Sequence, residues 1–159
     1  MNGPKFRGPP AVKLRPAGTQ FQEVAPMSTK HFPIAISPLW RPLLLPLGVT
    51  AKRSYAEISE GELHVCFGPF DYYFPLDAIE DATLARWPLW AGVGARTNFR
   101  GVVGLVGTYV NVVEIRFKEP QQIRMLLRVP CSRLFLSLEE PHSFINAVTR
   151  RRTAEMRAA

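Results

Sequence analysis

Apolar and polar residues alternate along most of the chain from residue 52 to residue 138, a pattern typical of strands with one buried face. In the run ELHVCFG (62–68), the residues on one face are Leu63, Val65 and Phe67, and those on the other are His64 and Cys66. Glu60 and Gly61 precede this run and indicate a hairpin turn. The alternation as a whole predicts strands at residues 52–59, 62–68, 71–76, 78–87, 111–117, 122–129 and 133–138.

The period changes near the C-terminus, where one helix is expected. Pro141 suits a first helical turn, and the preceding Glu139 and Glu140 suit the positive end of a helix dipole. The apolar residues that share one helical face are Phe144, Ile145 and Val148. Three arginines at 150–152 favour the C-terminal end. We therefore expect an amphipathic helix over residues 141–155.

These elements predict a mainly β fold with one C-terminal α-helix, in a single domain over residues 31–152 followed by a tail at 153–159. To hide its apolar face, such a sheet must curl on itself, as a partly open barrel of about seven strands that the helix caps.

A strand meander closed by one amphipathic helix, with the ending LSLEEPHSFINAVTRR, resembles the pleckstrin-homology-like (PH-like) domain, and small bacterial proteins of that type in particular. The resemblance covers residues 31–152 and implies a non-enzymatic binding or scaffolding domain. In lipid-binding members, basic residues around the first hairpin hold the phosphoinositide. This chain has Arg41, Lys52 and Arg53 there but lacks the spaced Lys/Arg-x-Arg pattern, so that ligand is not carried over.

Charge and proline content set the first 30 residues apart. Nine of the 15 prolines precede residue 50, and residues 1–30 show no apolar period, so we expect a disordered basic extension. Met27 is an alternative start of the protein. Of the net charge of +7, residues 1–30 carry +4 and residues 150–159 carry +3, whereas residues 31–149 are neutral. Basic ends allow an alternative function as a peripheral membrane or nucleic-acid binding module.

The stretch at 33–51 has the length of a membrane span, but Arg41 and four prolines argue against a transmembrane segment. No signal peptide is evident, so we expect a cytoplasmic protein, with peripheral contact to a membrane as the alternative. Cys66 and Cys131 are then expected as reduced, partly buried thiols rather than as a disulfide.

The run WAGVGARTNFRGVVGLVG (90–107) contains five glycines, which raises the question of a phosphate loop. It begins like a dinucleotide fingerprint, but Thr97 stands where the third glycine belongs, and strand residues follow instead of a helix. The P-loop motif also fails, because no lysine occurs between Arg53 and Lys118. We favour an architectural interpretation, in which the glycines serve turns, bends and bulges.

A binding site in the same region is the second interpretation. No acid occurs between Asp81 and Glu114, whereas three arginines and exposed aromatic residues do. Arginines beside aromatic rings can bind an anionic group or a protein partner. The candidate site comprises Arg86, Trp90, Arg96, Phe99 and Arg100, on a loop that also contains Trp87.

An enzymatic function is the least favoured. His64 and Cys66 share one strand face, but two residues do not make a catalytic set, and we predict no catalytic residue, metal site or cofactor. The leading hypothesis is a binding domain whose partner is a protein. Weak contact with anionic lipid or nucleic acid through the basic ends is the alternative.

Overall fold

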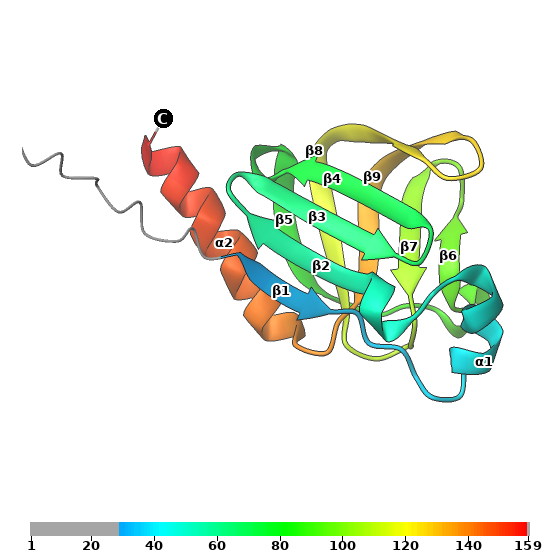
Figure 1. The fold of residues 1–159 in the computed structure, drawn as a ribbon. Helices are drawn as coiled ribbons and strands as arrows, with labels where there is room; N and C mark the ends of the chain where they lie inside the picture. Colours follow the sequence, from blue (N-terminus) through cyan, green and yellow to red (C-terminus); the bar gives the residue numbers. More distant parts are fainter. Residues whose placement is uncertain (1–28, 159) are drawn as a thin grey trace, which may run out of the picture.

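The computed structural model describes residues 29–158, which form two β-sheets packed face to face and helices at opposite sides of them (Figure 1). The fold is mainly β with one long C-terminal helix, as the sequence predicts. The expected extension at 1–30 lies outside the described residues except for its last two positions.

The first sheet is an antiparallel meander in the order β1-β2-β3-β4. Its strands are β1 (Lys30–Pro33), β2 (Ser54–Ser59), β3 (Glu62–Phe67) and β4 (Phe70–Pro75). The turn predicted at Glu60 and Gly61 joins β2 to β3, and Gly61 adopts the left-handed conformation (φ 70°) that such a turn favours. Leu63, Val65 and Phe67 are fully buried, so the predicted apolar face is confirmed.

The second sheet has the order β5-β8-β9-β7-β6 and is not a meander. Its strands are β5 (Ile79–Ala85), β6 (Gly94–Thr97), β7 (Gly101–Val106), β8 (Val112–Arg124) and β9 (Arg128–Ser137). β7 lies parallel to β9, so the expectation of a continuous meander is wrong here. The described residues form nine strands rather than about seven, and the two sheets do not close into a barrel. Three of the nine were not expected, β1 at the start of the domain and β6 and β7 in the glycine-rich run, whereas the strand expected at 111–117 and the start of the one expected at 122–129 form the single strand β8.

The β8–β9 hairpin also differs from the sequence prediction. The turn expected at Glu119 and Pro120 is an irregularity within β8, where the pairing register with β9 shifts between Arg116 and Gln121. The chain reverses instead after Arg124, and β9 then continues as one strand. A proline cannot donate to a ladder hydrogen bond, but it is tolerated where a bulge interrupts the ladder.

One hydrophobic core fills the space between the sheets and extends under the helix α2 (Pro141–Ala158). Phe144 and Val148 of α2 are fully buried, and Phe144 meets Phe32 edge to face with ring centroids 5.3 Å apart. The helix therefore docks as predicted, beside β5 (Figure 1). The helix continues past the end expected at residue 155 and reaches Ala158. Residues 153–158, which were expected to be a tail, are therefore helical.

Candidate functional site

The glycine-rich run forms the β6–β7 hairpin, and its tip is closed by its own side chains. Asn98 Oδ1 accepts hydrogen bonds from the backbone N–H groups of Arg100 (2.9 Å) and Val102 (3.0 Å), and Thr97 Oγ1 accepts one from Phe99 (3.0 Å). A phosphate loop needs free amides at a helix N-terminus. These amides are occupied and a strand follows, so the architectural interpretation describes the tip.

The loop before this hairpin folds across the outer face of the second sheet. Trp87 is buried there, and its indole N–H donates to the carbonyl oxygen of Gly92 (2.7 Å). The Trp87 ring lies 5.2 Å from the ring of Phe135 on β9. These two rings form a small apolar cluster with Val106 and Val112, on the opposite side of the sheet from the main core.

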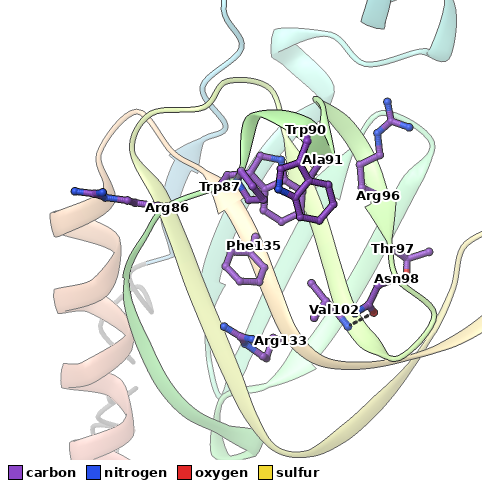
Figure 2. Close-up of a pocket in the computed structure, with 11 residues that line it drawn as sticks. Arg86, Trp87, Trp90, Ala91, Arg96, Thr97, Asn98, Val102, Arg133 and Phe135 are labelled. Atoms are coloured by element: carbon purple, nitrogen blue, oxygen red, sulfur yellow. Dashed lines mark hydrogen bonds between the residues drawn. The ribbon is translucent and has the colours of Figure 1, made fainter.

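A cavity of about 510 Å³ opens between this loop and the sheet. Its lining residues are Arg86, Trp87, Pro88, Trp90, Ala91, Arg96, Thr97, Asn98, Val102, Arg133 and Phe135. Figure 2 shows Trp87, Trp90 and Phe135 at its centre, Arg133 below Phe135, and Arg86 pointing outward. The surface that remains accessible combines aromatic rings with guanidinium groups.

The cavity includes some of the residues predicted for the site and not others. Arg86, Trp90 and Arg96 line it, whereas Phe99 and Arg100 lie at the exposed hairpin tip, outside the lining. Sequence reasoning missed Arg133 and Phe135, which come from β9. The alternation of RLFLSL does place both on the face opposite the core residues Leu134 and Leu136, but nothing local indicates that the distant loop covers that face.

Arg96 has a structural contact as well as an exposed side chain. Its Nε donates to the carbonyl oxygen of Val93 (3.2 Å), and its guanidinium lies over Gly92, where a Cβ atom would come 3.1 Å from Nη2. Arg96 therefore helps to hold the glycine loop. Within residues 29–158, no carboxylate lies within ion-pair distance of Arg86, Arg96 or Arg100.

Arg133 belongs to a charged cluster beside the cavity. Glu114 on β8 is 6% exposed and accepts hydrogen bonds from Arg133 and from Arg116 (2.9 Å). Burial raises the pKa of Glu114, but the hydrogen bonds and charges of Arg133 and Arg116 outweigh it, so the pKa lies below its ordinary value. Two guanidinium groups share one carboxylate, which leaves this side of the cavity positive. The Arg133 guanidinium carbon lies 5.4 Å from the centroid of the Phe135 ring.

The pairing of His64 with Cys66 that an enzymatic function would need is not formed. His64 Nε2 lies 2.5 Å from Asp71 Oδ1, and its ring stacks on Tyr73 with centroids 4.2 Å apart. Cys66 is buried, and its thiol donates to the carbonyl oxygen of Arg53. Burial raises the pKa of the Cys66 thiol, and that of Cys131 to about 12, the opposite of what activates a nucleophile. Both cysteines are free, as the sequence predicts.

Comparison of the chain with protein-family models, with curated proteins and with solved structures gives no significant match. None of the helices in the described part of the chain is long and apolar enough to cross a membrane. Over the same residues, no three His, Cys, Asp or Glu side chains group so as to hold a metal ion.

Proposed function

We propose that the protein is a binding domain without catalytic activity, whose Trp90–Arg96 cavity takes an acidic, aromatic segment of a protein partner. The observation that carries this proposal is the position of Trp90 in the cavity. Its side chain is 89% exposed, although it stands in a cavity whose floor includes the apolar Phe135.

An exposed tryptophan is costly to leave in water, because it presents a large apolar area that only a ligand can cover. Tryptophan and arginine are also the residues that contribute most to binding at protein interfaces. Trp90 supplies a flat ring for an aromatic or aliphatic side chain of the partner. The buried Trp87 and Phe135 form a fixed base, so the site loses little freedom on binding.

The charge of the cavity selects an anionic partner. Arg86 and Arg96 have no carboxylate partner among the described residues, and Arg133 shares Glu114 with Arg116. A carboxylate on the partner would accept bidentate hydrogen bonds from a guanidinium group. An acidic side chain next to an aromatic one therefore matches the cavity in charge and in shape.

The same side chains argue against catalysis. Among the described residues that line the cavity, none carries a carboxylate, an imidazole or a thiol. General acid–base and nucleophilic chemistry depend on such groups within hydrogen-bond reach of a substrate. The side chains of the cavity are therefore suited to binding a ligand and not to reacting with it.

We also keep the PH-like relationship as a proposal. The antiparallel first sheet and the closing helix α2 support it, whereas the parallel β7–β9 pair departs from a meander. Superposition of both sheets and α2 on a bacterial PH-like domain, strand by strand, would support the relationship, and a different strand order there would contradict it. A cytoplasmic location is part of the same proposal, because two free thiols suit a reducing compartment.

Panning a displayed random-peptide library against the full chain tests the function. We expect enrichment of peptides in which Asp or Glu stands near Phe, Tyr or Trp. Trp90→Ala and Arg96→Gln should each weaken the binding of an enriched peptide about tenfold, or 1.4 kcal/mol.

Two matched controls use the hairpin tip. Phe99 and Arg100 are an exposed aromatic residue and an exposed arginine outside the cavity lining, so Phe99→Ala and Arg100→Gln should bind normally. Equal loss in the controls, or no acidic peptides among those enriched, would contradict the proposal. Because Arg96 also holds the loop, thermal melting is measured in parallel. If Arg96→Gln melts early but each folded molecule still binds, Arg96 is only architectural.

A further inference from the structure

The connection between β1 and β2 carries a cluster of leucines that the fold leaves in water. It contains the short helix α1 (Arg41–Leu44) and the 3-10 turn η1 (Leu45–Leu47), which lie outside both sheets at the side opposite to α2 (Figure 1). Its exposed leucines are Leu39 (76%), Leu43 (58%), Leu45 (59%) and Leu47 (60%). Single exposed leucines are ordinary, but four within nine residues form a patch.

The segment that presents these leucines is firmly anchored. Leu44 and Val49 are 1% and 4% exposed and belong to the main core. Leu44 packs on β6, where a Cβ atom at Gly94 would lie 3.5 Å from its Cδ2. The leucines around Leu44 are therefore held outward by a fixed backbone, as expected of a preformed contact surface.

Two further exposed apolar residues adjoin the segment. Trp40 meets Tyr109 edge to face, with ring centroids 6.2 Å apart, and Tyr109 Oη donates to the carbonyl oxygen of Leu89 (3.4 Å). Leu89 is 74% exposed, and Val110, next to Tyr109, is 63% exposed. We call this surface the leucine end; it comprises Leu39, Leu43, Leu45, Leu47, Leu89 and Val110.

The charges along the chain at the leucine end are all positive. No Asp or Glu occurs at residues 24–56 or 82–113, the two segments from which it is built. Within and after the leucine segment stand the exposed side chains of Arg41, Lys52 and Arg53. Apolar side chains with basic residues around them are the composition that enters the interface of an anionic bilayer.

From this we infer that the leucine end docks the protein on an anionic lipid surface, with the leucines in the interface and the basic side chains at the phosphates. Long basic side chains can reach the headgroups while nearby apolar groups lie deeper. A second copy of the chain suits the surface less, because a symmetric contact would bring the same basic side chains together. This inference is independent of the peptide-binding cavity and uses α1 rather than the basic ends of the chain.

Flotation of the full chain with vesicles tests the inference. We expect binding to vesicles of phosphatidylcholine and phosphatidylserine at equal amounts, and little binding to phosphatidylcholine alone. The double variant Leu43→Ser, Leu47→Ser should bind the mixed vesicles at least about tenfold less, because it removes two apolar side chains from the contact. Both positions are exposed, so its melting temperature should stay close to that of the wild type.

The β8–β9 turn offers a matched control, since Leu126 and Leu127 lie between Arg124 and Arg128 and are 97% and 68% exposed. Leu126→Ser, Leu127→Ser should bind the vesicles normally. In the wild type, brominated lipid should also quench the tryptophan fluorescence, a readout that needs no variant. The inference is overturned if the protein does not bind the vesicles, or if the control variant loses as much binding as the Leu43, Leu47 variant. It is also overturned if the leucines are buried by self-association, or if binding responds to salt and is unchanged by the leucine substitutions.

Discussion

The six-membered ring of Trp87 packs directly on Gly104, where a Cβ atom would come within 2.4 Å of Trp87 Cη2. Trp87 belongs to the loop after β5, and Gly104 lies in the middle of β7. The contact brings the loop down on the sheet and so builds one wall of the cavity. Gly104, one glycine of the run that resembles a phosphate loop, thus leaves the space that the Trp87 ring occupies.

Gly104→Ala should destabilise the protein by roughly 1–3 kcal/mol, since overpacking forces the ring of Trp87 away from the strand. The hydrogen bond from the Trp87 indole to Gly92 would be strained in the same movement. The denaturant midpoint of unfolding measures the loss. The control is a double-mutant cycle with Trp87→Leu, in which the cost of Gly104→Ala should shrink. If Gly104→Ala destabilised the Trp87→Leu variant as much as the wild type, the Trp87 ring would not be the cause of the destabilisation.

Phe144→Ala should destabilise the protein by about 3 kcal/mol, as large-to-small changes at fully buried positions do. The side chain is 0% exposed and contacts Phe32 of the first sheet, so its removal leaves a cavity beneath α2. Urea denaturation followed by circular dichroism gives the value. Met156→Ala, at a position of the same helix that is 75% exposed, should change the midpoint little. An unchanged midpoint for Phe144→Ala would mean that α2 is not docked.

Glu114→Gln should lower stability at neutral pH and matter less in acid. The folded protein holds the pKa of Glu114 below its unfolded value, so the ionised carboxylate stabilises the fold above the ordinary glutamate pKa of about 4.3. That contribution is lost as the pH falls through the folded pKa. Urea midpoints of the wild type and the variant should therefore converge as the solution is acidified below about pH 4.

Glu60→Gln is the control for that series. Glu60 is exposed at the β2–β3 turn, and no ion pair is formed there among the described residues. Its replacement should shift the midpoint little at any pH. A constant difference between Glu114→Gln and the wild type across the range would show that the arginine cluster contributes no pH-dependent stability.

Local patterns were enough to predict most of the elements. The alternation in 62–68 and 111–117 sets which side chains face the core, because successive side chains of a strand point to opposite faces. The helix from Pro141 is likewise encoded in its first turn and its apolar stripe. The glycine run was less informative, since glycine suits a turn, a bulge and a strand under a large ring alike.

The order of the strands in the second sheet was decided by the tertiary structure alone. Alternation states which face of a strand is apolar, but not which strand lies beside it, so the parallel pairing of β7 with β9 had no local sign. Pro120 indicated a turn, yet β8 pairs with β9 on both sides of this proline. The chain therefore continues through Pro120 with a shift in register instead of reversing there.

The candidate site shows the same division. The sequence by itself determined that Arg86, Trp90 and Arg96 occur together in an acid-free interval. Only the packing of the loop on the second sheet added Arg133 and Phe135 to them and left Phe99 and Arg100 outside. A cavity depends on contacts between residues far apart in the chain, and the stacking of Trp87 on Gly104 that creates this one is such a contact.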